Sequence, residues 1–527
     1  MFIQKIHKKT AKKTYTTVYL TENYRENGKI KHRFLANLSA LPEKYIEGLQ
    51  QMLKGEKINN ISDLHLSQGK SFGAISVVNK LANELGIKQA LGNCKQAKLA
   101  MIQIAARIIS PGSRNYTANE WSKFQALEAI FKIKKFNEDD LYANLDWLNE
   151  NQSEIEQKIF NHRHKNQDIK EIYLYDVTSS YFEGNKNELA EYGYNRDKKR
   201  GKKQIVIGLL TDKYGYPVSI EVFKGNTGDT STFSNQLKKL KDVFGVETVV
   251  FVGDKGMVKS TQIEEIISDE YKWNYLTSIT KNQINTLIKN DVIQLELFED
   301  KLVEVTDKED VRYILRKNPH RAKEIKDNRK SKIACIKELA NNQNIYLKEH
   351  PKAQEHVALN KVQEKIARLK LSGFISCNIE NRTICVKTDL AKQKKEAELD
   401  GCYVIKTDVS KSKLTTKLAH DRYKDLAKVE SAFRTMKTTI ENVRPIYVRK
   451  EIRTRAHVFI AMLSYLIIKY MSERLQGLKY SRRFTIECLD KIAYLEYQYE
   501  GKKISIIPDK LNNEQNNILK ALNIQLK

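Results

Sequence analysis

The stretch Ile172-Tyr-Leu-Tyr-Asp-Val-Thr-Ser-Ser-Tyr-Phe182 decides the fold. Its apolar, β-branched and aromatic residues predict a buried strand at 171–177. Asp176 stands inside this strand, and a carboxylate in such surroundings is costly unless it is paired or bound to a metal. Asp176 is therefore the first candidate for a chemical role.

A second predicted strand also leads to a carboxylate. The run Thr248-Val-Val-Phe-Val-Gly-Asp-Lys-Gly-Met257 is apolar up to Gly253 and continues into a turn at Asp254. An aspartate at a strand end is commonly a cap or turn residue. Asp254 therefore becomes a candidate for a chemical role only in combination with the other carboxylates.

A third carboxylate, Glu430, lies in the segment Tyr423–Lys437, which has a helical pattern. Residues three, four and seven apart return to the same side of a helix, so one face would carry an aromatic residue, a carboxylate and two cations. Its positions are 423, 426, 430, 434 and 437. An amphipathic surface helix with incidental charges would give the same pattern.

The elements between these carboxylates follow a recognisable order. The Asp176 strand is followed by the polar, basic segment 195–203 and by two predicted hairpin strands at 204–211 and 217–223. A helix is then predicted from Asp229 to about 244, before the strand that leads to Asp254. A helix at 260–270 and a strand at 274–279 follow. Adjacent strands would bring Asp176 and Asp254 together, with the Glu430 helix beside them. This order predicts an α/β fold with a ribonuclease H-like mixed-sheet core.

The region before the core has a different pattern of apolar and polar residues. Residues 14–35 alternate apolar and polar residues around a turn at Glu26-Asn-Gly-Lys29, which predicts a β-hairpin. Residues 42–55 and 72–163 have helical periodicity. We expect a mostly helical N-terminal region that starts with a small β-hairpin, and helical DNA-binding units fit such a region.

Five regions are expected along the chain. They are 1–165 (hairpin plus helices), 166–280 (first part of the core), 281–400 (a highly charged insertion domain), 401–480 (second part of the core, with the Glu430 helix) and 481–527 (C-terminal tail). Within the insertion, strands are expected at 292–297, 311–315, 374–378 and 383–386, and helix at 321–371. Helices are also expected at 415–441 and 452–475.

The composition points to a polyanionic partner. The 527 residues include 92 Lys+Arg against 65 Asp+Glu, a net charge of +27. Such an excess is typical of nucleic-acid-binding proteins, although a lysine-rich proteome would produce it too. The six cysteines form no C-x-x-C pair, which disfavours a zinc site or a disulfide framework. The basic N-terminus lacks the apolar run of a signal peptide, and no apolar stretch is long enough to span a bilayer.

Three clustered carboxylates suit divalent metal. Mg²⁺ prefers oxygen ligands and keeps waters and substrate phosphates in its shell. Two such ions can activate an attacking oxygen and stabilise a leaving one during phosphoryl transfer, with no need for a histidine or a covalent nucleophile. On a strongly basic chain this predicts chemistry on DNA.

Four pieces of the sequence resemble bacterial insertion-sequence transposases of the DDE type. They are Tyr175–Phe182, Gln204–Thr232, Val252–Met257, and Tyr423–Lys437 with the following Arg444–Arg449 and Ala456–Ile460. The last piece is similar to the Y-(2)-R-(3)-E-(6)-K signature of a subgroup whose core carries a largely β-stranded insertion before the glutamate. Tyr423, Glu430 and Lys437 match the signature, whereas Leu426 stands where it has arginine.

The resemblance implies a transposase that binds the terminal inverted repeats of its element, cuts 3′ ends with water and joins them to target DNA. Asp176, Asp254 and Glu430 would hold two Mg²⁺ ions, or Mn²⁺. A homodimer on paired ends and a place in the bacterial cytoplasm, at the nucleoid, are implied as well. Expected DNA contacts come from Tyr423, Arg434, Lys437, Arg422, Lys199, Arg200, Lys202 and Lys203.

Other readings of the same residues stay open. A metal-dependent nuclease that cuts without strand transfer would use the same three carboxylates. A non-catalytic or decayed DNA-binding protein would retain the basic surface without the chemistry. An RNA-binding protein is a third class consistent with the net charge.

Overall fold

The computed structural model describes residues 1–9, 14–26, 28–55, 65–165, 171–184, 186–197, 199–438, 447–499, 502–506 and 511–526. The chain forms two compact units. Unit 1 comprises Met1–Glu247 and Ala427–Lys527, and unit 2 comprises Thr248–Leu426. No helix in the described part of the chain is long and apolar enough to cross a membrane.

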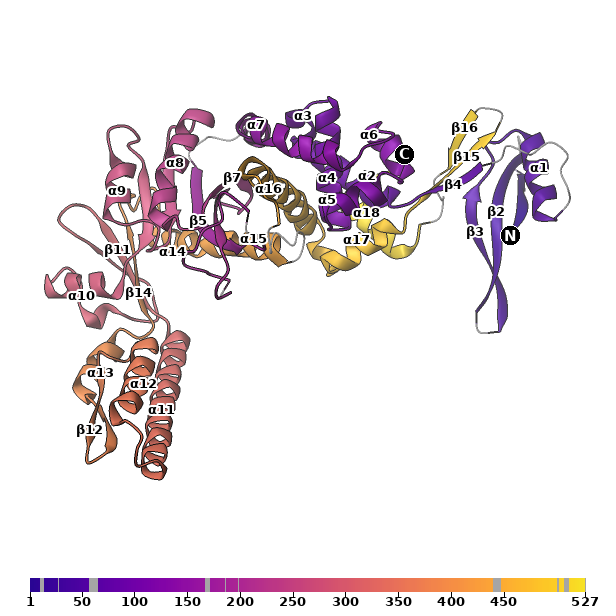
Figure 1. The fold of residues 1–527 in the computed structure, drawn as a ribbon. Coiled ribbons are helices and arrows are strands. Elements are labelled where there is room, and N and C mark those ends of the chain that lie inside the picture. The colour runs from indigo at the N-terminus through magenta and orange to yellow at the C-terminus, as the bar shows by residue number, and fades with distance from the viewer. Residues whose placement is uncertain are drawn as a thin grey trace. The chain divides into compact units, whose positions relative to one another are not determined.

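Unit 1 begins with a three-stranded antiparallel sheet in the order β1-β2-β3 (Figure 1). The strands are β1 Phe2–Lys9, β2 Thr14–Glu26 and β3 Lys29–Asn37, and helix α1 is Glu43–Leu53. The side chains of Val18, Ala36 and Ile46 are buried in a small core between this sheet and α1. The predicted hairpin and helix are confirmed, and β1 is an additional strand.

A helical layer follows. It consists of α2 Phe72–Glu84, α3 Ile87–Leu91, α4 Lys95–Ile109, α5 Arg114–Tyr116, α6 Gln125–Phe131 and α7 Glu138–Arg163. Helix α16 (Glu451–Arg474), from the other end of the sequence, packs against α4, α7 and β7. Every residue from Ala456 to Ile468 is buried, as expected for a helix that is apolar on all sides and enclosed by its neighbours.

The mixed sheet of the core has eight strands. Unit 1 contributes β5 Glu171–Tyr181, β6 Gln204–Asp212 and β7 Pro217–Lys224, in the order β5-β6-β7 with both pairings antiparallel. Unit 2 contributes β8 Val249–Gly253, β9 Asn274–Ser278, β10 Val303–Thr306, β11 Arg312–Lys317 and β14 Cys402–Thr407, in the order β10-β11-β14-β9-β8. Strands β8 and β9 are parallel. The predicted α/β class with a mixed-sheet core is confirmed.

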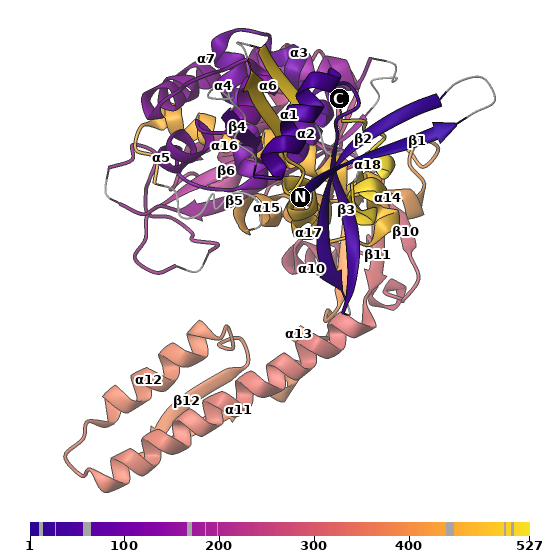
Figure 2. The ribbon, with the colours of Figure 1, turned by 90° about the vertical axis from the view of Figure 1, so that its right-hand side faces the viewer.

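Unit 2 also carries helices α9 Ser260–Ile267, α10 Lys281–Lys289 and α14 Thr416–Lys424. Between β11 and β14 the chain forms a small subdomain from α11 Pro319–Glu349, α12 Glu355–Arg368, β12 Ile375–Glu380, β13 Thr383–Thr388 and α13 Leu390–Glu398 (Figure 2). Its apolar core includes Ile336, Val362 and Phe374.

This insertion is mostly helical, which confirms the helix expected at 321–371 as α11 and α12 and corrects the largely β-stranded insertion that the resemblance implied. The Lys- and Glu-rich stretch lacks the β-branched alternation of strands and forms two long helices instead. The strand expected at 292–297 is also wrong, because a 3₁₀ turn, Leu295–Leu297, occupies it. The expected strands at 311–315, 374–378 and 383–386 are confirmed as β11, β12 and β13.

Two expected helices prove to be composite. The one expected from Asp229 consists of a 3₁₀ turn Asp229–Thr232, α8 Phe233–Lys238 and a π turn Lys239–Val243. The one expected at 415–441 divides at Asp425 into α14 and α15 (Leu426–Thr438). At that division the backbone N–H of Asp425 donates to the carbonyls of Asp421 and Arg422, which closes the last turn of α14.

The C-terminal residues complete unit 1. They form α17 Arg482–Asp490, β15 Tyr494–Tyr499, β16 Lys502–Ile506 and α18 Asn513–Ala521. Strand β15 pairs with β4 (His65–Gly69), so the two ends of the sequence share a three-stranded sheet in the order β16-β15-β4.

Candidate active site

Asp176 occupies the middle of β5, opposite Leu209 of β6. Its side chain is half-buried, whereas Leu174 and Tyr175 are fully buried. The backbone N–H of Val177 donates to Asp176 Oδ1 at 2.8 Å. The predicted strand therefore holds this carboxylate at a fixed position on the sheet.

Tyr175 anchors the same strand from its other face. Its hydroxyl donates to the carbonyl of Thr232 at 3.4 Å, and burial, with smaller contributions from the nearby carboxylates, raises the pKa of the phenol. Gly208 of β6 makes room for the ring, because a Cβ at this position would collide with the Tyr175 hydroxyl. A larger residue at position 208 would therefore displace β5 near Asp176.

Glu430 lies on the exposed side of α15. The buried side of this helix carries Val429, Ala432, Phe433 and Met436, at the spacing of an amphipathic helix. Arg434, one turn beyond Glu430, is also exposed. The described part of α15 therefore presents a carboxylate and a guanidinium on one side and packs with the other.

Two lysines fix α15 to the hairpin strands of unit 1. Lys437 Nζ donates to Thr178 Oγ1 at 2.7 Å and to the carbonyl of Ser179, both on β5. Near the other end of the helix, Lys428 Nζ donates to the carbonyl of Lys213 in the β6–β7 turn at 3.0 Å. Glu430 lies between these two anchors, so its helix runs along the sheet that carries Asp176.

Thr178 and Asp176 project from the same face of β5, because side chains alternate along a strand. Glu430 and Lys437 share one side of α15, about two turns apart. The bond between Lys437 and Thr178 thus joins the helix face that carries Glu430 to the strand face that carries Asp176. These contacts all lie within unit 1.

The Lys437 side chain is less exposed than expected for a lysine that only contacts DNA phosphates. Only 10% of its side chain is exposed, and it forms an ion pair with Asp197 at 3.2 Å. The Asp197 side chain is 4% exposed and also accepts from the backbone N–H of Tyr181. The sequence analysis did not single out Asp197, although an acid within a basic run is a signal that could have identified it.

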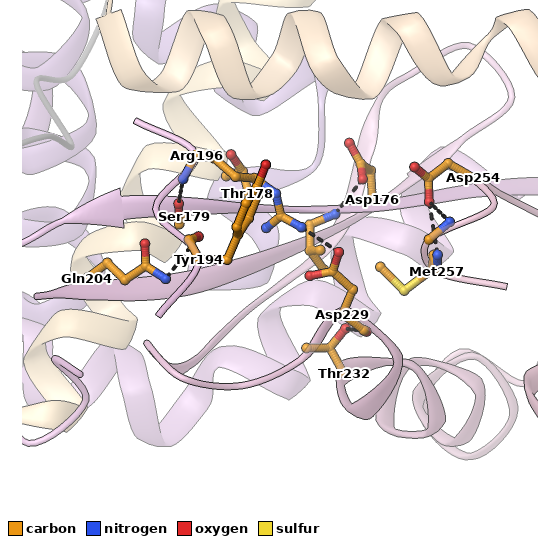
Figure 3. A network of polar contacts seen from close by, with 12 residues as sticks. Asp176, Thr178, Ser179, Tyr194, Arg196, Gln204, Asp229, Thr232, Asp254 and Met257 are labelled. Carbon is orange, nitrogen blue, oxygen red and sulfur yellow. Dashed lines mark hydrogen bonds and ion pairs between the residues drawn. The ribbon is translucent and has the colours of Figure 1, made fainter. Parts of the chain in front are cut away.

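Arg196 extends this arrangement on the same strands. Its backbone N–H donates to Ser179 Oγ at 2.9 Å, and its guanidinium forms an ion pair with Asp229 at the start of the 3₁₀ turn (Figure 3). Asp229 is thus a charge partner as well as the first residue of a turn. Gln204 of β6 also links neighbouring segments, because its side-chain nitrogen donates to the carbonyls of Tyr194 and Gly225.

Asp254 lies in unit 2, directly after β8, and its side chain is exposed. Its Oδ1 accepts from the backbone N–H groups of Gly256 and Met257, both at 2.9 Å (Figure 3). This is an Asx-type turn, in which the carboxylate organises the backbone that follows it. The second carboxylate oxygen makes neither of these bonds.

Tyr423 and Arg422 lie on α14 of unit 2. The Tyr423 hydroxyl donates to Ser278 Oγ at 2.7 Å, and Arg422 forms an ion pair with Asp425 at 2.7 Å. Asp425 separates α14, which carries Tyr423, from α15, which carries Glu430. Leu426 is buried, 9% exposed, and therefore lies on the packed side of α15.

The basic segment before β6 is at the surface. Lys199, Arg200 and Lys202 are exposed and Lys203 is half-buried. Lys202 forms an ion pair with Glu183 at 2.7 Å, and the ammonium groups of Lys199 and Lys203 lie over the rings of Tyr181 and Tyr192. These cations are attached to β5 and β6 and face solvent.

The donor set of the three predicted carboxylates consists of oxygen atoms alone, which suits Mg²⁺ or Mn²⁺. Among the residues that the structure describes, no three His, Cys, Asp or Glu side chains are gathered closely enough to hold a metal ion. A metal site built from Asp176, Asp254 and Glu430 remains a prediction.

Comparison with known proteins identifies the family. Residues 168–467, more than half of the chain, match the family described as "Transposase DDE domain". Residues 3–63 match "IS1634 family transposase, N-terminal domain". No curated protein sequence matches. A similar solved structure is the piggyBac transposase synaptic complex with hairpin DNA, with 10% identity, a TM-score of 0.37, and coverage of 80% of this chain and 82% of that one.

The protein thus combines a mixed-sheet α/β core with an inserted subdomain and a separate N-terminal sheet. The chain belongs to the DDE transposase family, and its N-terminal residues match the insertion-sequence type. It is a DDE-type transposase, an enzyme that acts on DNA. Enzymes of this family generally depend on divalent metal.

Proposed function

We propose that this transposase binds the terminal inverted repeats of its own insertion sequence and cuts the 3′ ends with water as nucleophile. The freed 3′ hydroxyl then attacks target DNA. In both steps an oxygen nucleophile displaces an oxygen leaving group at phosphorus, so one site serves both. Membership of the DDE family supports this proposal.

The catalytic residues in this proposal are Asp176, Asp254 and Glu430. The observation that carries it is the bond between Lys437 and Thr178, which joins the helix of Glu430 to the strand of Asp176. Asp254 would supply the third carboxylate from the turn after β8, with one of its oxygens already engaged by that turn.

The three carboxylates would hold two Mg²⁺ ions, with Mn²⁺ as a substitute. Bound metal would stabilise charge on the attacking and leaving oxygens. The chain's own groups do the rest: β5 fixes Asp176, and α15 fixes Glu430 through its two lysine anchors. Lys437 acts in this scheme as a positioning residue as well as a positive charge near DNA.

Contacts to the DNA backbone would come from Arg434, beside Glu430, and from the exposed basic segment Lys199, Arg200, Lys202 and Lys203. Lys and Arg side chains replace counterions at phosphates and so position the duplex without reading its sequence. Arg422 and Tyr423 would contribute from α14. The protein would act as a homodimer on paired ends, at the nucleoid in the bacterial cytoplasm.

The test is cleavage of labelled DNA that carries the inverted repeats, with Mg²⁺ or with EDTA. Wild type is compared with Glu430→Gln and with Glu487→Gln, an exposed helix glutamate of the same unit. We expect metal-dependent cutting at the repeat ends by wild type and Glu487→Gln only. Cutting by Glu430→Gln at the wild-type rate would refute the assignment of Glu430.

A supercoiled plasmid that bears both ends separates the alternatives. Joined products support strand transfer, whereas nicks alone indicate a nuclease. Binding of the ends without any cutting would indicate a DNA-binding protein that has lost its chemistry.

A further inference from the structure

Unit 1 contains a cavity whose lining includes none of the three predicted carboxylates. It has a volume of about 280 Å³ and is lined by Arg107, Gly112, Ser113, Arg114, Tyr142, Tyr447, Val448 and His457. These residues come from α4, α5, α7 and α16 and from the segment before α16. Tyr447 is 69% exposed, so the cavity extends to the surface.

Two arginines and a histidine meet at the wall of this cavity. Arg114 Nη2 lies 2.9 Å and Arg107 Nη2 3.3 Å from His457 Nδ1. All three residues are at least nine-tenths buried. Because both guanidinium groups can only donate, His457 Nδ1 is the acceptor, and the imidazole is therefore neutral with its proton on Nε2.

The charge of Arg114 is not balanced by the side chains that it contacts. Its Nε donates to the amide oxygen of Gln103 at 3.3 Å, and its Nη2 donates to the neutral His457. Within the described residues Arg114 forms no ion pair with a carboxylate. Two acids of α7, one turn before and one turn after the lining residue Tyr142, are engaged elsewhere: Asp146 holds Arg453 through two bonds of 2.7 Å, and Glu138 accepts from Asn115.

A buried, unbalanced guanidinium is costly, and its electrostatics reflect this. Burial and then repulsion from Arg107 lower the pKa of Arg114 to about 9. Burial and both arginines hold the pKa of His457 well below its ordinary value. An anion in the cavity would relieve each of these effects.

We propose that this cavity binds one phosphate group of the DNA, with Arg114 as its charged donor. A guanidinium presents paired N–H donors that match phosphate oxygens, and burial strengthens such charge-assisted bonds. Ser113 adds a neutral donor: its Oγ accepts from the backbone N–H of Tyr116 at 3.0 Å, which leaves its hydroxyl hydrogen to donate. The cavity exceeds the roughly 30 Å³ share of one water several-fold, enough for a phosphate with solvent.

Phosphate chemistry alone does not separate a DNA phosphodiester from free phosphate. We assign DNA because the cavity reaches the surface of a chain with a net charge of +27. This choice rests on the proposed function, whereas the anion site itself does not. The experiment therefore has one arm for each.

The first arm measures the thermal unfolding midpoint of the full chain in sodium phosphate and in sodium chloride at equal ionic strength. Phosphate should raise the wild-type midpoint by about 1–3 °C relative to chloride, since a ligand that binds the folded state stabilises it. Arg114→Gln should abolish this difference. Arg483→Gln, which removes an equal charge at a side chain that is 89% exposed, should retain it. Equal phosphate effects in wild type and Arg114→Gln overturn the site.

The second arm measures the salt dependence of duplex DNA binding. Loss of one phosphate contact lowers the slope of log K against log [salt] by about one, so Arg114→Gln should show this decrease and Arg483→Gln should not. An unchanged slope, together with a specific phosphate effect in the first arm, overturns DNA as the ligand. Neither arm requires cleavage, so a failure of the proposed function would be seen separately.

Arg114→Lys keeps the fold testable if the glutamine variant does not fold. It retains the charge but loses the paired donors, so the phosphate-induced shift should decrease without disappearing. A wild-type protein whose midpoint is the same in phosphate and chloride overturns the proposal without any variant.

Discussion

Lys437 Nζ of α15 and Thr178 Oγ1 of β5 lie 2.7 Å apart, and the same ammonium group pairs with Asp197. Both charges are largely buried, with 10% and 4% of their side chains exposed. This contact joins residues that are 259 positions apart in the sequence and attaches the helix of Glu430 to the strand of Asp176. Lys437 therefore contributes to the stability of unit 1 and, in the proposed function, holds the helix that carries Glu430 in position.

Replacement of Lys437 by methionine should destabilise the protein strongly. It leaves Asp197 buried without its cation, a change that typically costs about 3–5 kcal/mol. The double variant Lys437→Met/Asp197→Asn should be more stable than Lys437→Met alone, because the uncompensated charge is gone. Urea unfolding of Lys437→Met, Asp197→Asn and the double variant, each compared with wild type, measures this coupling.

An exposed pair provides the control for that cycle. Arg483 and Glu487 lie one turn apart on α17 with a 2.7 Å contact, and Arg483→Met should cost only about 0.3–0.5 kcal/mol. If the effects of Lys437→Met and Asp197→Asn simply add, the two charges do not stabilise each other and α15 is held by other contacts.

Asp254 allows its structural and chemical roles to be separated. Asp254→Asn retains an oxygen that can accept from Gly256 and Met257, so the turn should persist and the unfolding midpoint should change little. Cleavage should nevertheless decrease by more than about 100-fold, since loss of groups that merely support a metal ligand already costs about 10–100-fold. Asp254→Ala should lose both activity and about 1 kcal/mol of stability.

Parallel assays of cleavage and thermal unfolding on both variants check this prediction. Substantial cleavage by Asp254→Asn would mean that the residue only shapes the turn, and the third carboxylate would have to be sought elsewhere.

The core strands could be predicted because their pattern is local. Strands β5, β6 and β8 are apolar runs bounded by polar turns, and hairpin signals separate their neighbours. Strand β1 could not be predicted in the same way, because Lys and His residues fill it and its stability comes from pairing with β2. The pairing of β15 with β4 joins opposite ends of the chain and leaves no local signal.

The residues of the candidate site remain a prediction from the sequence pattern, and the sequence did not predict the contacts around them. The acidic positions stand out in apolar strands, and helical spacing gathers Glu430 with Lys437. The partner of Lys437 is not visible in this way, because Asp197 belongs to a loop far upstream in the sequence. The division of the helix at Asp425 also escaped prediction, since neither glycine nor proline marks it.

Gly208 should not tolerate even a methyl group. Its Cβ would meet the Tyr175 hydroxyl, and Tyr175 is fully buried beside Asp176, so Gly208→Ala should cost about 1–3 kcal/mol through overpacking. Gly477 is exposed and has open space around its Cβ position, so Gly477→Ala should be neutral or slightly stabilising. Equal unfolding midpoints for the two variants would show that β5 adjusts freely to its neighbour.

His457 should make the stability of the protein depend on pH. Burial holds its folded-state pKa well below the ordinary value of 6.5, and the groups that face it are the cations Arg107 and Arg114, with Tyr142 in the lining of the same cavity. At pH values below about 6.5 the unfolded chain therefore binds a proton that the folded chain does not. Folding stability should decrease as the pH falls, with a slope of at most about 1.4 kcal/mol per pH unit from this residue.

The comparison of wild type with His457→Gln isolates this contribution from that of the carboxylates, which act at lower pH. Glutamine retains an oxygen that can accept from both arginines but does not titrate. The difference in unfolding free energy between the two proteins should be constant above about pH 7 and should shift in favour of the variant below pH 6.5. A difference that stays constant down to pH 5 would mean that the imidazole is as readily protonated in the folded protein as in the unfolded chain.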